Sequence, residues 1–217
     1  MEQSDSMDFR ALQTGIRQRF DAKMKGREIA LVAARKAIRS SANAIRAIHR
    51  SEPDEASRLL DEARAALDEG ESALEAHPDV RHAGFLHDAQ KEYAEARLTE
   101  AVVAGKDLPS PADVRVQDAA YLNGMAETIG ECRRSVLDLL RRGEVDRSEE
   151  ILREMEDMYY VLVTMDYPDA ITGNLRRSTD VARGIIEKTR GDLSLSLVQR
   201  DLRDALERHA EELRGRG

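Results

Sequence analysis

The sequence predicts an all-α fold, and three observations support this prediction. Residues that favour helices (Ala, Leu, Glu and Arg) dominate a chain of 217 residues in which aromatic residues make up only 4%. The 5 prolines and 13 glycines are too few for the turns of an all-β domain of this length. Between the prolines, apolar residues recur every three or four positions, which keeps them on one helix face. A hydrophobic content of 41% is enough to build a core.

The spacing and the residues that start and stop helices predict about seven helices in one domain, residues 1–217. Ser51 to Asp54 and Ser110-Pro111 have the composition of helix entries, whereas Gly105 and Gly143 mark helix ends. Residues 1–24 form a partly disordered first part of a long first helix, which Gly15 and Gly26 can interrupt, and residues 193–217 form the C-terminal helix. The expected helices span residues 6–50, 54–76, 80–104, 111–142, 146–166, 170–190 and 194–214.

The composition also restricts the cellular setting. No stretch approaches the roughly 18 apolar residues of a membrane span, and the first residues lack the basic and apolar regions of a signal peptide. Cys132 is the only cysteine, which excludes an internal disulfide and fits a reducing compartment. We therefore expect a cytoplasmic protein with no membrane partner, in which Cys132 is a buried structural thiol.

A row of arginines stands out on the first predicted helix. The net charge of the chain is −8, yet residues 16–50 carry ten basic and two acidic residues. Arg35, Arg39, Arg46 and Arg50 fall within roughly 60° on a helical wheel. Guanidinium groups bind phosphate oxygens in pairs, so this row is a candidate nucleic-acid contact. The alternative is a solvated face that pairs with acids elsewhere on the chain.

Acidic residues form two triplets with the spacing i, i+4 and i+7. These triplets are Asp88, Glu92 and Glu95, and Glu150, Glu154 and Asp157. The helix between them adds Glu127 and Glu131, one turn apart. Carboxylates from different helices can hold Mg²⁺ or Mn²⁺, which activate water and stabilise the leaving oxygen at a phosphodiester. Among 42 acidic residues, exposed triplets also arise by chance.

Several segments together resemble the translin family, which includes translin and translin-associated factor X. Residues 92–96 (EYAEA) resemble the EYxEA element of the family's third helix. Residues 121–124 and 130–134 resemble its YLxG…GELxR element, and residues 166–177 resemble archaeal members. The likeness extends over residues 25–192, including residues 40–50 of the first helix.

This resemblance implies an all-α fold of about seven helices in a closed homo-oligomer, commonly an octamer. It also implies binding of single-stranded RNA or DNA and, for the factor X type, Mg²⁺-dependent endoribonuclease activity, with Mn²⁺ as a possible substitute. By this resemblance the catalytic and metal-binding acids are Glu92, Glu95 and Asp157, and Glu131 completes the metal shell. A shift of one turn in the match gives the role of Asp157 to Glu154.

These sequence features are compatible with three functions. The first is a metal-dependent endoribonuclease in which Arg35, Arg39 and Arg46 hold phosphates beside the acids. The second is an oligomer that binds single-stranded nucleic acid without cutting it. The third is a structural helical bundle with no nucleic-acid role, for which binding would not weaken steeply with salt as phosphate contacts require.

Overall fold

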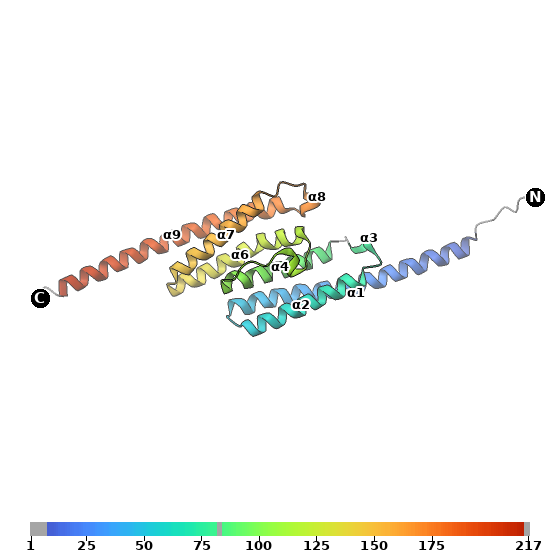
Figure 1. Cartoon of the computed structure of the whole chain (residues 1–217), viewed down its shortest axis with the longest axis horizontal. Coiled ribbons are helices and arrows are strands. Elements are labelled where there is room, and N and C mark those ends of the chain that lie inside the picture. Colours follow the sequence, from blue (N-terminus) through green and yellow to red (C-terminus); the bar gives the residue numbers. More distant parts are fainter. Residues whose placement is uncertain (1–7, 82–83, 215–217) are drawn as a thin grey trace, which may run out of the picture.

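A computed structural model describes residues 8–81 and 84–214, and it confirms the all-α prediction. In these residues the structure contains nine helices and no strand (Figure 1). The helices are α1 (Phe9–His49), α2 (Pro53–Ala73), α3 (Pro78–Arg81), α4 (Phe85–Ala104), α5 (Pro111–Val114), α6 (Asp118–Arg142), α7 (Val145–Val163), α8 (Asp169–Thr172) and α9 (Leu175–Arg214).

The long helices pack side by side, with α4 and α6 in the middle of the bundle. α1 and α2 cover one side of this central pair, and α7 and α9 cover the other (Figure 1). Buried alanines on α1, such as Ala37 and Ala44, let it lie close to its neighbours. The largest fully buried side chains are Leu60, Leu67, Leu74, Leu98, Val102, Ile129, Val136, Ile151, Met155, Met158, Leu162 and Leu175.

Several predicted helix ends are confirmed. α4 and α6 end where Gly105 (φ 63°) and Gly143 (φ 80°) take the left-handed conformation that glycine adopts without strain. Ser110 caps α5 by accepting a hydrogen bond from the Asp113 amide, and the Asp113 carboxylate accepts one from the Ser110 amide. α1 runs as one helix through Gly15 and Gly26.

Three predicted boundaries are wrong. The predicted helix 111–142 is divided into α5 and α6, because Arg115 (φ 52°) takes a left-handed conformation between them. The predicted helix 80–104 is represented by α3 and α4, which are separate helices with Gly84 (φ 91°) before α4. The predicted helices 170–190 and 194–214 are instead the short α8 and the 40-residue α9, which continues through Gly191.

The continuity of α9 has a physical reason. Thr189 and Leu193 are buried on either side of Gly191, so packing against the bundle holds this turn helical. That packing offsets the cost of about 1 kcal/mol that glycine brings to a helix interior. Both α9 and α1 extend beyond the bundle, at opposite ends of the molecule (Figure 1).

Two further expectations can be compared with the structure. Cys132 is buried, as expected, and burial raises the pKa of its thiol well above the usual range. Within residues 8–81 and 84–214, no helix combines the length and apolar character that crossing a membrane requires. Of residues 1–24, which we expected to be partly disordered, residues 9–24 belong to the continuous helix α1. Residues 1–7 lie outside the described residues.

Candidate metal centre

The centre of the molecule is a close approach of α4 and α6 at Gly124. A Cβ atom placed on Gly124 would lie 2.7 Å from the Lys91 carbonyl oxygen and 2.9 Å from the Ala94 Cβ. Any larger residue would therefore push the two helices apart. One turn further along α6, the Thr128 hydroxyl donates to the Gly124 carbonyl (2.9 Å) and also lies 3.4 Å from the Glu95 carbonyl. The absence of a side chain at Gly124 and the hydroxyl of Thr128 thus let the backbones of α4 and α6 lie close together.

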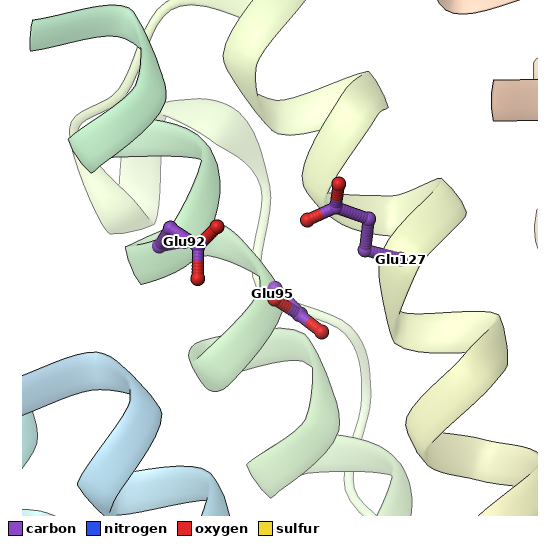
Figure 2. Close-up of side chains that lie close together, drawn as sticks. All are labelled: Glu92, Glu95 and Glu127. Atoms are coloured by element: carbon purple, nitrogen blue, oxygen red, sulfur yellow. The ribbon is translucent and has the colours of Figure 1, made fainter. Parts of the chain in front are cut away.

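This approach brings three carboxylates into one group. Glu92 and Glu95 on α4 and Glu127 on α6 each offer a carboxylate oxygen, and these oxygens lie within 4.8 Å of one another. Figure 2 shows the three side chains directed toward the space between the two helices. We call Glu92, Glu95 and Glu127 the acid cluster. The predicted pairing of Glu92 with Glu95 is present, and Glu127 lies beside them.

Glu95 is the most deeply placed member of the acid cluster, with 9% of its surface exposed. Burial raises its pKa to about 8, and the negative charges of Glu127, Glu92 and Glu131 add to the effect. Ionising Glu95 near neutral pH therefore requires an additional positive charge close by. A strongly shifted carboxyl that other acids surround is typical of a functional site.

Lys91 supplies part of that positive charge. Its ammonium group lies 2.7 Å from a Glu127 oxygen and 3.3 Å from a Glu92 oxygen. Burial lowers the Lys91 pKa, but the two carboxylates outweigh this effect, so the pKa is raised overall. Lys91 remains charged and bridges two members of the acid cluster.

The donor set of the acid cluster fits a divalent cation. Three ionised carboxylates and one ammonium leave a net charge of −2, which one Mg²⁺ or Mn²⁺ would neutralise. Carboxylate oxygens are hard ligands of the kind these ions prefer, and no histidine or cysteine belongs to the group. Burial, followed by the charges of the neighbouring carboxylates, favours the protonated form of Glu95 when no cation is bound.

Glu131 has a different partner from the acid cluster. Its carboxylate is hydrogen-bonded to the buried His49 at the end of α1, with 2.5 Å between oxygen and Nε2. This bond, followed by the charges of His49 and Arg134, lowers the Glu131 pKa. Glu131 lies one turn beyond Glu127, so it borders the acid cluster and fastens α1 to α6. The predicted metal role of Glu131 stays a prediction.

Asp157 and Glu154 lie on α7 and do not belong to the acid cluster. Asp157 is exposed. Glu154 is half-buried and lies 3.6 Å from Arg147, which also pairs with Glu150 at 2.8 Å. The second predicted triplet therefore faces an arginine on its own helix. The catalytic role that the resemblance gives to Asp157, or to Glu154, remains a prediction. In the structure, Glu127 is the third carboxylate beside Glu92 and Glu95.

Arg35, Arg39 and Arg46 lie exposed on α1, and Arg50 is exposed directly after the end of this helix. Arg46 donates to the Asn43 side-chain oxygen at 2.6 Å, and Arg50 forms an ion pair with Glu52 at 2.6 Å. The ion pairs described for α1 do not include Arg35 or Arg39. On a helical wheel the row lies roughly 70° from His49. His49 contacts Glu131 on α6, so of the four arginines Arg46 and Arg50 are those nearest along the chain to this contact.

Glu127 belongs to the acids noted in the sequence but not to the predicted metal site, and Lys91 was not predicted at all. A signal for Glu127 was present in the sequence. Gly124 lies three residues before it in the YLNG segment, and a glycine inside an apolar helical seam indicates close approach of another backbone. The partner backbone carries Glu92 and Glu95.

The chain is similar in sequence to a curated protein and in fold to several solved structures. No family model matches the chain. The uncharacterized protein MJ0175 of Methanocaldococcus jannaschii is 33% identical over 184 residues, which cover 84% of this chain and 81% of the relative. Similar solved structures include AfC3PO in complex with duplex RNA (31% identity, 87% of this chain, 97% of that chain, TM-score 0.80).

Two further structures extend this comparison. AfC3PO alone is 30% identical, with 87% of this chain and 98% of that chain covered and a TM-score of 0.77. Apo-NeC3PO is 19% identical, with 89% of this chain and 100% of that chain covered and a TM-score of 0.76. At 19% identity, the likeness to NeC3PO concerns the fold alone. The likeness to AfC3PO extends along nearly the whole of that chain.

Proposed function

The chain belongs to the translin family, and we propose that it is an oligomeric RNA-binding protein with metal-dependent endoribonuclease activity. The acid cluster is the observation that carries the proposal. The carboxylates of Glu92, Glu95 and Glu127, from two helices, lie within 4.8 Å of one another, and the pKa of Glu95 is raised to about 8. A structural ion pair needs no such excess of negative charge.

Glu92, Glu95 and Glu127 would hold Mg²⁺ or Mn²⁺ at this site. The ion would lower the pKa of a water molecule and stabilise negative charge on the phosphate oxygens. The chain itself fixes the ligands, because Gly124 and Thr128 hold α4 against α6. The same contact keeps Glu95 out of bulk water, where its charge would be screened.

The arginine row would hold the RNA backbone beside the acid cluster. Arg35 and Arg39 are exposed on α1, and the His49–Glu131 contact ties that helix to the helix that carries Glu127. Contacts to phosphates position a strand without selecting bases, so cleavage is expected to tolerate many sequences. The neighbouring AfC3PO structure contains duplex RNA, and we propose single-stranded RNA, and single-stranded DNA for binding, as the ligands of this chain.

One observation favours a non-catalytic alternative, in which the protein binds single-stranded nucleic acid without cutting it. Lys91 already pairs with Glu92 and Glu127. If that ammonium satisfies the carboxylates permanently, the acid cluster is a structural network and no metal enters.

The test is an incubation of purified protein with end-labelled single-stranded and duplex RNA in Mg²⁺, Mn²⁺ or EDTA. The Glu92→Gln/Glu95→Gln variant is assayed in parallel, and binding is measured by fluorescence anisotropy at several salt concentrations. We expect metal-dependent cleavage of single-stranded RNA, loss of cleavage in the variant, and binding in both proteins that weakens steeply with salt.

Each other result has a clear meaning. RNA that is bound but never cut, with no Mn²⁺ bound in a calorimetric titration, supports the non-catalytic alternative. Cleavage that persists in the variant would place the active site elsewhere or reveal a contaminating nuclease. Binding that does not change with salt would contradict phosphate contact by the arginine row.

A further inference from the structure

Two helical segments extend beyond the bundle at opposite ends of the molecule (Figure 1). One is the start of α1, residues 9–24, which we call the N-terminal arm. The other is the end of α9, residues 195–214, which we call the C-terminal arm. Each segment is more than 20 Å long at about 1.5 Å per residue, and most of its residues are exposed.

The N-terminal arm carries large apolar side chains on one face. They recur at intervals of three and then four residues and fall within about 120° on a helical wheel. All are exposed, including Phe20 at 63%. These side chains are Phe9, Leu12, Ile16, Phe20 and Met24.

The C-terminal arm carries an apolar row with matching spacing. Its members also fall within about 120° of one another. All are exposed, including Leu202 at 59%. These side chains are Leu195, Val198, Leu202, Leu206 and Leu213.

The two rows match each other in register. Both begin with the intervals three, four and four, which average about 3.7 residues and so stay close to the 3.6-residue turn of a straight helix. Aligning Phe9 with Leu195 therefore aligns Ile16 with Leu202 and Phe20 with Leu206. A helix whose apolar face is exposed over five turns is stable in water when another surface covers it.

Charge favours pairing between unlike arms. Residues 9–24 contain four basic and one acidic residue, whereas residues 195–214 contain four basic and five acidic residues. Two N-terminal arms would bring together net charges of +3 and +3. An N-terminal and a C-terminal arm would bring together +3 and −1, which is attractive at close range.

The arms of one chain cannot meet, because they leave the bundle in opposite directions (Figure 1). We propose that the N-terminal arm of one chain packs against the C-terminal arm of a second copy, with their apolar rows in contact. In Figure 1, α1 and α9 run in the same direction along the molecule. Head-to-tail copies therefore place the two arms parallel. Such contacts are heterologous, so they generate a ring when the rotation closes and a filament when it does not.

A membrane surface is the competing occupant of the N-terminal arm, because a basic amphipathic helix also binds anionic lipid. It would leave the matching row on the C-terminal arm unexplained. The second copy accounts for both rows, the spacing that their first four members share and the difference in their charge. This contact does not depend on the acid cluster or on any nuclease activity.

Mixed cysteine cross-linking tests the arm contact. Full-length Ile16→Cys and Leu202→Cys proteins are prepared separately and oxidised alone or after mixing, and products are resolved by non-reducing electrophoresis and peptide mass spectrometry. We expect a disulfide between residues 16 and 202 of different chains only in the mixture. Cys132 is buried, so the unmodified protein serves as the uncrosslinked control.

The other outcomes overturn the proposal. A disulfide within either single-variant sample would show that like arms pair, and no disulfide in the mixture would show that unlike arms do not meet. A second measurement uses light scattering on Leu202→Glu, beside Gln18→Glu on the opposite face of α1 as a control. We expect at least a twofold fall in assembly mass for Leu202→Glu alone. An unchanged mass, or binding of the intact protein to anionic vesicles through residues 9–24, would contradict the arm contact.

Discussion

Two groups of acidic residues in this protein have the same spacing and different surroundings. Asp88, Glu92 and Glu95 on α4 and Glu150, Glu154 and Asp157 on α7 both follow i, i+4 and i+7. Glu92 and Glu95 are joined by Glu127 from α6, and one of them is nearly buried. The α7 group is more exposed, and two of its members, Glu150 and Glu154, pair with Arg147.

The difference shows that spacing along one helix does not make a metal site. A second helix must bring a further carboxylate close to the first two. The negative charge of the group must also exceed the positive charge of the lysines and arginines beside it. On α4, Gly124 and burial of Glu95 meet these conditions. On α7, Arg147 compensates two carboxylates directly, although burial raises the pKa of Glu154.

The largest expected effect comes from neutralising the acids of each group. We expect Glu127→Gln to lower the rate of metal-dependent RNA cleavage roughly a thousandfold or more, because a ligand of the ion is lost. Asp157→Asn and Glu154→Gln are expected to change the rate less than about threefold. Single-turnover cleavage assays at saturating enzyme measure all three. A large loss at Asp157 with little loss at Glu127 would instead support the assignment made by resemblance.

The next effect concerns stability against pH in the absence of metal. Glu95 has a pKa of about 8 in the folded chain and an ordinary value when unfolded. Between these values the folded state binds more protons, so stability falls as pH rises. Between pH 5 and pH 8, we expect the free energy of unfolding of Glu95→Gln to fall by roughly 3 kcal/mol less than that of the unmodified protein. Urea unfolding at several pH values measures this difference.

The matched control for that measurement is Glu154→Gln. This carboxyl is half-exposed and lies next to Arg147, so we expect its replacement to change the pH dependence by less than about 0.5 kcal/mol. Equal changes in the two variants would mean that the environments of the two acid groups do not differ in the way the structure indicates.

A smaller effect is expected from widening the contact between α4 and α6. In Gly124→Ala the new methyl group meets the Lys91 carbonyl oxygen, which moves Glu127 away from Glu92 and Glu95. We expect Mn²⁺ affinity to fall about 10- to 100-fold, as it does when supporting contacts of metal ligands are lost. Electron paramagnetic resonance of free Mn²⁺ measures this affinity. Gly184→Ala is the control, because nothing lies within 4 Å of that position.

The smallest effect tests the charge of Lys91. Its ammonium group competes with a divalent ion for Glu92 and Glu127, so Lys91→Met is expected to raise Mn²⁺ affinity about tenfold. Lys106→Met, on the exposed residue after α4, is the control for a general change of charge. A fall in affinity at Lys91→Met would show that the lysine positions the carboxylates rather than competing for them.

Much of this protein was predictable from local sequence. The all-α class follows from apolar spacing, and the ends of α4 and α6 follow from Gly105 and Gly143. The same local patterns did not predict the break at Arg115, because a left-handed arginine has no compositional signature. They also divided α9 at Gly191, where packing of Leu193 overrides the propensity of a single glycine.

The candidate site divides in the same way. The sequence by itself determined that Glu92 and Glu95 share a helix face, and that arginines form a row on the first helix. Only the tertiary structure decided that Glu127, rather than Asp157, lies beside Glu92 and Glu95. That choice depends on how closely two helices pack and on which acids an arginine already neutralises. Both are properties of contacts between residues far apart in the chain, so helical spacing carries no record of them.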